Sequence, residues 1–332
     1  MVKKPHPLAL PPRASPELAR LMDVARDFIA HARSPRTVAQ YKSQWTLFVR
    51  WCEQHGLACL PAAPETLALY VTHLSERGLA MSTLELALAA IAEAHKIRNH
   101  ASPRKAAVVR EALKGIRRLR GRPARGREPL LADQFQQMLS VIPDSLRGRR
   151  DRALLMFGFL GGFRRSELVG MRWNDLTVKP DGIIVQLFGS KDDRALKGRV
   201  VAIPRAPNRA VCPVDALDRY RRMARIVDGP VFRSVDRHGN VGGALSGRDV
   251  ARIVKRYASA AGLDETVFSG HSLRSGMVTS AHLAGAPLES IMKVTGHKSY
   301  DTTMKYVRKA DLFRQHPSAG LLDGASGRRG RL

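Results

Sequence analysis

The sequence predicts two domains, a helical one followed by an α+β one that is mainly α with a small antiparallel sheet. The chain has 332 residues, which at roughly 150 residues per domain favours two. Apolar residues in the first third recur at helical spacing, and two strand-like runs occur only later. We expect a helical bundle at 15–116, a linker at 117–128, an α+β domain at 129–315 and a tail at 316–332.

Helix start signals organise the N-terminal domain. Serine followed by proline is typical of an N-cap and a first helical position, and it opens three expected helices: Ser15-Pro16, Ser34-Pro35 and Ser102-Pro103. Two further helices are expected at 65–77, before Gly78, and from Ser82 to 98, where Ser82 and Glu85 fit a capping box. Tyr41, Trp45 and Phe48 fall on one apolar stripe, so we interpret them as core residues rather than base-stacking groups.

The segment Arg117–Arg127 contains six arginines, two glycines and one proline. Such a composition cannot bury an apolar face, so we interpret it as a linker. The arginines either remain solvated or lie along a phosphate backbone, and the sequence leaves both readings open.

The C-terminal domain mixes element types. A buried helix is expected at 150–161, and a hairpin is expected from strands at 182–188 and 198–204 joined by a loop at 189–197. Ser246 and Asp249 resemble a capping pair. Further helices follow to the end of the domain: 213–225, 247–261, 271–284, 288–295 and 301–309.

Charge points to a polyanionic partner. The 56 basic and 29 acidic residues leave +27, and arginine outnumbers lysine 42 to 14. Arginine's planar fork suits phosphate, so nucleic acid is the first candidate. A G+C-rich genome would also enrich arginine, and an anionic membrane surface competes, although no basic amphipathic anchor is evident. No run of 18 apolar residues occurs, which argues against a membrane span.

Several other function classes lose support. The sequence lacks a phosphate-cradling GxxxxGK[ST] loop, an HExxH pair and a spaced acidic cluster, so nucleotide-driven motors and metal-dependent nucleases are disfavoured. We expect no cofactor and no metal. Three cysteines without zinc-site spacing favour reduced thiols in the cytoplasm.

Three short boxes carry the chemical signal. They are Gly161–Leu168 (GGFRRSEL), His271–Arg274 (HSLR) and Gly296–Tyr306, in which Tyr306 stands nine residues after His297. HxxR alone is weak, because His95–Arg98 repeats it in an expected helix. In this order, however, the boxes resemble those of the tyrosine recombinase (phage integrase) family, and the upstream helices resemble its SAM-like core-binding domain.

The resemblance implies six site residues. Arg164 matches the first catalytic arginine, His271 and Arg274 match the HxxR pair, His297 matches a position held by His or Trp, and Tyr306 matches the nucleophile. Lys191 matches the β-hairpin lysine. Lys197 in the same loop is an alternative to Lys191, and Arg165 is an alternative to Arg164, although the register to Ser166-Glu167-Leu168 favours Arg164.

This set is suited to metal- and ATP-independent cleavage of DNA. Two guanidinium groups, on Arg164 and Arg274, can bind the non-bridging oxygens of a phosphodiester while a phenol attacks phosphorus. His271 is the candidate base, and Lys191 is the candidate acid for the departing 5′ oxygen. The product would be a 3′-phosphotyrosyl enzyme. We interpret Glu167 as a partner that orients a catalytic arginine, rather than as a proton donor.

The implied function is site-specific recombination, namely integration, excision or resolution. The resemblance implies double-stranded DNA with an inverted-repeat core site, a homotetramer on two paired sites, a mobile-element setting and a nucleoid-associated protein in the cytoplasm. Accessory DNA-bending proteins are compatible, and no membrane partner is expected. Apolar residues after Tyr306 predict an arm that docks on a neighbour: Leu312, Phe313, Leu321 and Leu322. The alternatives are a type IB topoisomerase and a non-catalytic DNA-binding regulator.

Overall fold

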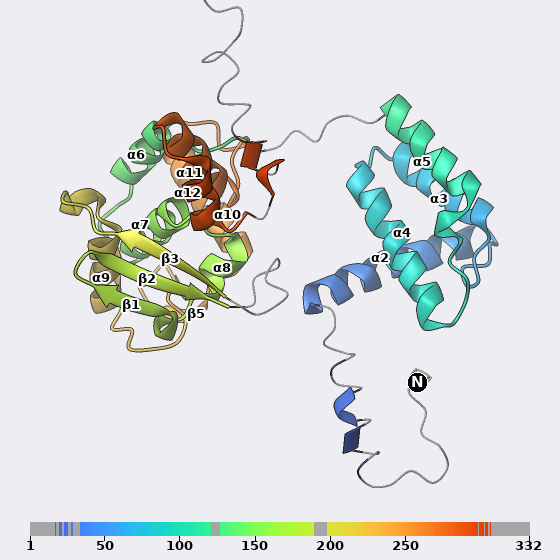
Figure 1. Cartoon of the computed structure of the whole chain (residues 1–332), viewed down its shortest axis with the longest axis horizontal. Helices are drawn as coiled ribbons and strands as arrows, with labels where there is room; N and C mark the ends of the chain where they lie inside the picture. Colours follow the sequence, from blue (N-terminus) through green and yellow to red (C-terminus); the bar gives the residue numbers. More distant parts are fainter. Residues whose placement is uncertain are drawn as a thin grey trace, which may run out of the picture. The chain divides into compact units, whose positions relative to one another are not determined.

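The computed structural model of the protein describes residues 34–120, 127–188, 198–297, 299–301, 303, 304 and 306, with seven helical positions before them (17, 20, 21, 23–25 and 28). The chain divides into two compact units, one ending at Arg125 and one beginning at Gly126 (Figure 1). The expected loop at 189–197 with Lys191 and Lys197, the four arm residues and the tail at 316–332 lie outside the described residues.

The first unit is helical, as expected. Its described elements are α2 (Pro35–Gln54), α3 (Pro64–Glu76), α4 (Met81–Ile97), the 3-10 turn η1 (Pro103–Lys105) and α5 (Ala107–Arg120). The Ser34 side chain accepts a hydrogen bond from the Thr37 amide, which confirms that start signal. Phe48 is fully buried and Trp45 packs against the same core, whereas Tyr41 is only half-buried.

Two of the expected helix starts are wrong. No side chain caps α4, which begins at Met81 after Ala80, so Ser82 lies within the helix instead of capping it. Ser102 opens only η1, its hydroxyl accepting from the Arg104 amide at 3.4 Å, and α5 begins later. Serine in a first turn can cap a 3-10 turn as well as a helix, so the residue pattern alone does not separate the two.

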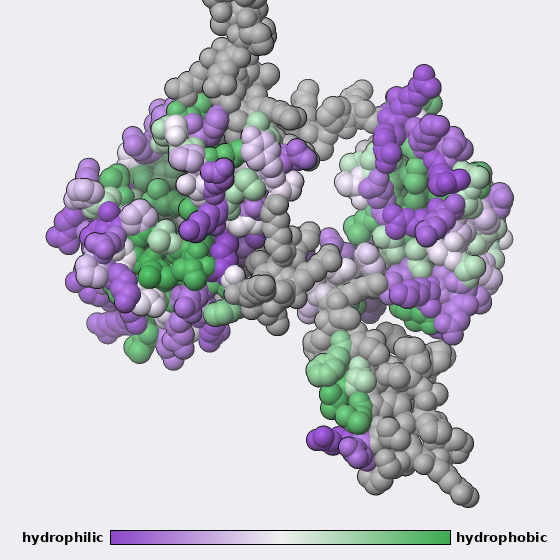
Figure 2. Space-filling view, viewed as in Figure 1, coloured by the Kyte–Doolittle hydropathy of each residue, from purple (hydrophilic) through white to green (hydrophobic). Residues whose placement is uncertain are grey.

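Helix α5 shortens the expected linker. It runs through Arg117–Arg120, because Arg117 binds Glu85 at 2.9 Å and Arg120 binds Glu76 at 2.6 Å. Arginine is also a good helix former and complements the dipole of a last helical turn. Figure 2 shows a hydrophilic band along this helix. At the other end, the Glu128 amide donates to Val267 O at 3.0 Å, so that residue is anchored in the second unit.

The second unit combines helices with two small antiparallel sheets. A three-stranded sheet has the order β1-β2-β3, and β4 pairs with β5. The expected hairpin is confirmed as β2 and β3, with Leu187 opposite Arg199. The strands are β1 (Leu176–Lys179), β2 (Gly182–Leu187), β3 (Arg199–Pro204), β4 (Arg233–Val235) and β5 (Val241–Ala244).

Helix α7 forms the middle of this unit (Figure 1) and packs against both α9 and α11. Most of its residues are buried, Leu154, Leu155 and Phe157 completely. The Ser246–Asp249 cap predicted for α10 is confirmed. The helices are α6 (Ala132–Ser140), α7 (Leu146–Leu160), α8 (Arg165–Gly170), α9 (Pro213–Met223), α10 (Gly247–Ala260), α11 (Ser272–Leu283) and α12 (Leu288–Thr295), with short turns η2 (Trp173–Asp175) and η3 (Arg209–Val211).

The isolated HxxR of the first unit is structural. His95 is fully buried in α4, its Nε2 accepts from the Ala62 amide at 3.0 Å, and its Nδ1 contacts Ile91 O at 2.8 Å. One nitrogen accepts and the other donates, so the neutral ring is satisfied on both sides. This histidine therefore ties the loop before α3 to α4. Within the part of the chain that the structure describes, no helix combines the length and apolar character needed to cross a membrane.

Candidate active site

The first sequence box forms the turn between α7 and α8. Gly162 has φ +55°, and a Cβ there would lie 3.0 Å from Thr295 Cγ2, so glycine is required on both conformational and steric grounds. Arg164 precedes α8, and its backbone amide donates to Glu167 Oε2 at 2.9 Å while its Nη1 donates to Glu167 Oε1 at 2.6 Å. Glu167 thus orients Arg164, as interpreted from the sequence.

Arg274 carries a buried charge that is only partly satisfied. Its side chain is 2% exposed, and its Nη1 donates to Gly162 O at 2.6 Å. Its Nη2 is buried without a hydrogen-bond partner among the described residues. Burial, and next the charge of Arg164, lower the pKa of Arg274 to about 10. The guanidinium group remains charged at neutral pH. An anion beside Nη2 would therefore offset the free-energy cost of burying this donor without a hydrogen-bond partner.

His271 and Tyr306 are in direct contact. His271 Nε2 lies 2.8 Å from Tyr306 Oη. Partial removal from water lowers the pKa of His271, and the charges of Arg274, Arg165 and Arg164 lower it further. A ring that is neutral at pH 7 can accept the phenol proton. Burial raises the pKa of Tyr306, whereas the Arg274 charge acts in the opposite direction.

His297 stacks on the same phenol. The His297 and Tyr306 ring centroids lie 6.1 Å apart with the planes at 21°. Thr295 Oγ1 contacts His297 Nδ1 at 3.0 Å and donates to Ile291 O at 2.8 Å, so the hydroxyl is left to accept from Nδ1–H. Burial first, then nearby arginines, lower the pKa of His297 to about 4. A bound phosphate would counter that effect and favour a donor at Nε2.

Arg199 is a site residue that the sequence reasoning missed. It begins β3, and its Nη2 donates to Glu167 Oε2 at 2.8 Å while its Nη1 donates to Val294 O in the last turn of α12. A Cβ on Gly296 would lie 2.8 Å from Arg199 Cδ. Arg199 therefore joins the partner of Arg164 to the segment that presents His297. Among 42 arginines, only its place at the end of the expected hairpin loop could have singled it out.

The structure therefore brings five of the six expected residues into one electrostatically connected cluster: Arg164, His271, Arg274, His297 and Tyr306. The sixth, Lys191, lies outside the described residues. The aliphatic stem of Arg165 packs against Gly270, the residue before His271. A Cβ on Gly270 would clash with Arg165 Cδ, so the two residues are in close contact. Among the described residues, no cluster of His, Cys, Asp and Glu has the makings of a metal site.

Two family models match this chain. The model of the phage integrase family matches residues 128–312, and that of the phage integrase N-terminal SAM-like domain matches residues 28–98. The chain belongs to the phage integrase family. The expected resemblance is confirmed, and so is the fold class of a SAM-like helical domain plus a mainly helical catalytic domain with small antiparallel sheets.

Similar proteins are named as recombinases. An integrase/recombinase xerD homolog of Selenomonas ruminantium is 37% identical over 302 residues, covering 90% of this chain and 88% of the relative. A tyrosine recombinase XerC of Xanthomonas axonopodis pv. citri (strain 306) is 28% identical over 307 residues, covering 87% and 90%. The chain is an Xer-like tyrosine recombinase, an enzyme of site-specific recombination, which confirms the expected enzyme class.

Solved structures share the fold. A lambda integrase dimer bound to a COC′ core site has a TM-score of 0.56 at 17% identity, covering 89% of this chain and 81% of that one. XerH in a post-cleavage complex with palindromic difH substrate has a TM-score of 0.55 at 16% identity, covering 79% and 72%. At these identities, the likeness concerns the fold alone.

Proposed function

We propose that Tyr306 is the nucleophile that cleaves and rejoins DNA in this recombinase. The observation that carries the proposal is the 2.8 Å contact between Tyr306 Oη and His271 Nε2. This contact lies within the electrostatic influence of Arg274, whose buried Nη2 has no hydrogen-bond partner among the described residues. The candidate nucleophile, its candidate base and a cation that can bind phosphate oxygens thus lie in one cluster. Covalent phosphoryl transfer needs this arrangement.

The proposed step balances without a metal or ATP. Tyr306 Oη attacks phosphorus, its proton passes to His271 Nε2, and the bond from phosphorus to the 5′ oxygen breaks. The departing oxygen takes a proton from an acid, for which Lys191 is the candidate. The phosphotyrosyl ester retains the phosphoester linkage, so a 5′-hydroxyl from another strand reverses the step and completes strand exchange.

The arginines would stabilise the transition state. Negative charge grows on the non-bridging oxygens during attack. Arg164, held by Glu167, and Arg274, held by Gly162 O, present pre-oriented donors. Donors that need no reorganisation typically contribute several kcal/mol. His297 joins them once its Nε2 carries a proton.

The assembly we propose is a homotetramer on two inverted-repeat core sites. A lambda integrase tetramer bound to a Holliday junction shares the fold, with a TM-score of 0.54 at 18% identity. The net charge of +27 supports salt-sensitive backbone binding. We also propose a nucleoid location and a mobile-element setting as finer features of this function, which is compatible with accessory DNA-bending proteins. No membrane partner is proposed.

A covalent-trapping experiment tests the nucleophile. The first step is to search the DNA beside the gene for inverted repeats with arms of about 11–13 base pairs, which a symmetric pair of proteins would read. A nicked duplex of that sequence is then incubated with the protein. Wild type should form an adduct that survives denaturing electrophoresis. Y306F should not, whereas Y300F should, because Tyr300 is 61% exposed and has no place in the cluster.

An adduct formed by Y306F would refute the assignment of the nucleophile. Relaxation of any supercoiled plasmid, with no preference for the core site, would instead support the topoisomerase alternative. An R164A variant that forms no adduct but leaves all in vivo function unchanged would support the non-catalytic regulator. Each outcome therefore separates one reading from the others.

A further inference from the structure

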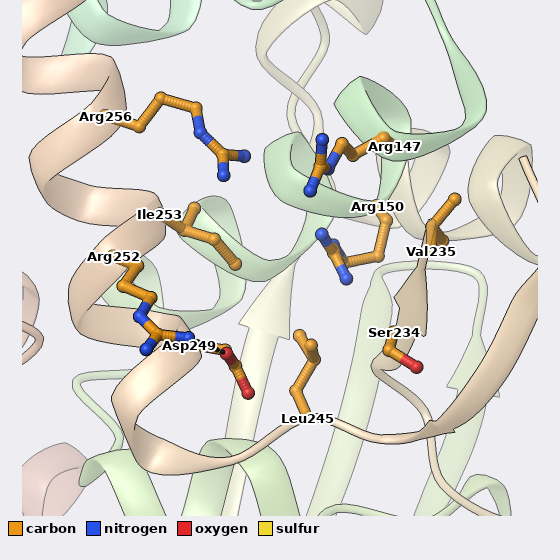
Figure 3. A pocket seen from close by; sticks show the side chains of 9 residues that line it. All are labelled: Arg147, Arg150, Ser234, Val235, Leu245, Asp249, Arg252, Ile253 and Arg256. Atoms are coloured by element: carbon orange, nitrogen blue, oxygen red, sulfur yellow. Dashed lines mark hydrogen bonds and ion pairs between the residues drawn. The ribbon is translucent and has the colours of Figure 1, made fainter. Parts of the chain in front are cut away.

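A second group of arginines lines a pocket that shares no residue with the candidate active site. The pocket has a volume of about 180 Å³ and lies between the start of α7, strand β4 and helix α10. Four arginines face it: Arg147, Arg150, Arg252 and Arg256. Figure 3 shows the guanidinium groups of Arg147, Arg150 and Arg256 pointing toward the same space from two different helices.

Arg150 is the fixed part of the pocket. It is 3% exposed, its Nε donates to Asp151 Oδ1 at 2.6 Å, and its Nη1 donates to Arg233 O at 2.6 Å. These two bonds hold the guanidinium plane in place. A buried charge whose orientation is already set loses little entropy when a ligand binds, which is the main requirement of a preorganised site.

The carboxylates nearby are already engaged. Asp151 is fully buried and is shared by Arg150, by the Tyr257 hydroxyl at 2.9 Å and by Arg256 at 3.5 Å. Burial, then Asp151, raise the pKa of Tyr257 to about 12, so that hydroxyl stays a neutral donor. Asp249 caps α10 by accepting from Ser246 and also binds Arg252 at 3.4 Å.

The charges in the pocket do not cancel. Four guanidinium groups face two carboxylates, which leaves an excess of two positive charges. Arg147 is exposed and has no acidic partner among the described residues. Like charges that converge from two helices repel one another, and the repulsion is relieved by an anion placed between them.

We propose that this pocket binds a phosphate group. Guanidinium forks match the oxygens of phosphate, and a tetrahedral anion can accept from three converging arginines at once, whereas a carboxylate is satisfied by one fork. The group can come from two sources, free inorganic phosphate or the backbone of bound DNA. The chemistry of recognition is the same in both, and it lies outside the phosphodiester that the enzyme cleaves.

The first test uses inorganic phosphate on the full chain. Thermal unfolding is followed in potassium phosphate and in potassium chloride of equal ionic strength, each variant against its own chloride baseline. At phosphate about tenfold above its Kd, the Tm of wild type should rise by roughly 4 °C. R147Q should reduce this rise, and R147Q/R256Q should lower it to the part that phosphate bound at the active-site arginines contributes. R225Q should retain it, because Arg225 is exposed and lines neither the pocket nor the active site.

The second test separates the two sources. DNA affinity is measured by anisotropy over a salt series with a duplex that lacks the core site. The steepness of log K against log salt falls by about 0.9 for each DNA phosphate that the protein no longer neutralises. A shallower slope in R147Q/R256Q than in R225Q identifies backbone phosphate. An unchanged slope, with a phosphate-induced rise in Tm that R147Q/R256Q lowers, identifies the free anion. Neither effect, or equal effects in R225Q, overturns the proposal. Adduct formation at Tyr306 is read separately, so failure here leaves the proposed function standing.

Discussion

Arg199 offers the most direct test of how the site is held together. Replacing it with methionine keeps an unbranched apolar stem but removes the guanidinium group that donates to Glu167 Oε2 and Val294 O. A hydrogen bond to a charged group contributes about 1.5–3 kcal/mol, and breaking a buried ion pair costs about 3–5 kcal/mol. The loss of unfolding free energy here should be smaller than that of a fully broken pair. Glu167 still has Arg164 as an ion-pair partner, and burial already disfavours the charge on Arg199.

We therefore expect R199M to destabilise the second unit by about 2–3 kcal/mol. That corresponds to a fall in Tm of roughly 4–12 °C for a domain of this size. Single-turnover cleavage should fall further, by about 10–100-fold, because Glu167 then holds Arg164 less firmly and α12 presents His297 less firmly. DNA affinity should change less than about twofold, since the substituted group faces protein rather than solvent.

The matched control lies just beyond the other end of the same strand. Arg205 is paired with Asp215 at 3.1 Å and its side chain is 41% exposed, so R205M should cost less than about 1 kcal/mol. R199K should recover only part of the cleavage rate, because an ammonium group cannot span two acceptors as a fork does. Wild-type cleavage by folded R199M, or an equal loss in R205M, would show that Arg199 does not position the site.

Three further predictions concern single residues. The depressed pKa of His297, about 4 against 6.5 unfolded, means that the unfolded chain binds more protons in this window. Stability should therefore fall as the pH drops from 6.5 toward 4, and denaturant titration should find a shallower fall in H297N. G162A should cost about 1–3 kcal/mol of unfolding free energy, because its φ is positive and Thr295 crowds its Cβ. G170A, with open space around its Cβ, should cost far less, and equal losses would remove the steric argument. H95Q should destabilise the first unit by about 1–3 kcal/mol yet leave the adduct yield of folded protein intact; a loss of cleavage chemistry would contradict its structural role.

Local signals predicted the parts of the fold that depend on neighbouring residues. Ser34 and Ser246 marked helix starts because each side chain caps amides within its own first turn. The β2–β3 hairpin followed from two β-rich runs around one loop. Helices α6 and α8 were not predicted, because their N-cap residues, Leu131 and Arg164, are not residue types that mark a helix start. Strands β4 and β5 are three and four residues long, too short for a periodic pattern.

The sequence by itself determined the family and the enzyme class, and it predicted which side chains form the active site, because these inferences depend on residue types at set spacings along the chain. The sequence already favoured His271 over His95, but only the tertiary structure shows the contacts: His95 is satisfied inside α4 and the loop before α3, whereas His271 contacts Tyr306, 35 positions further along the chain. The tertiary structure also decided that Arg199, unmarked among many arginines, holds Glu167. Hydrogen bonds and ion pairs act through space, so partners remote in sequence become visible only when the chain is folded.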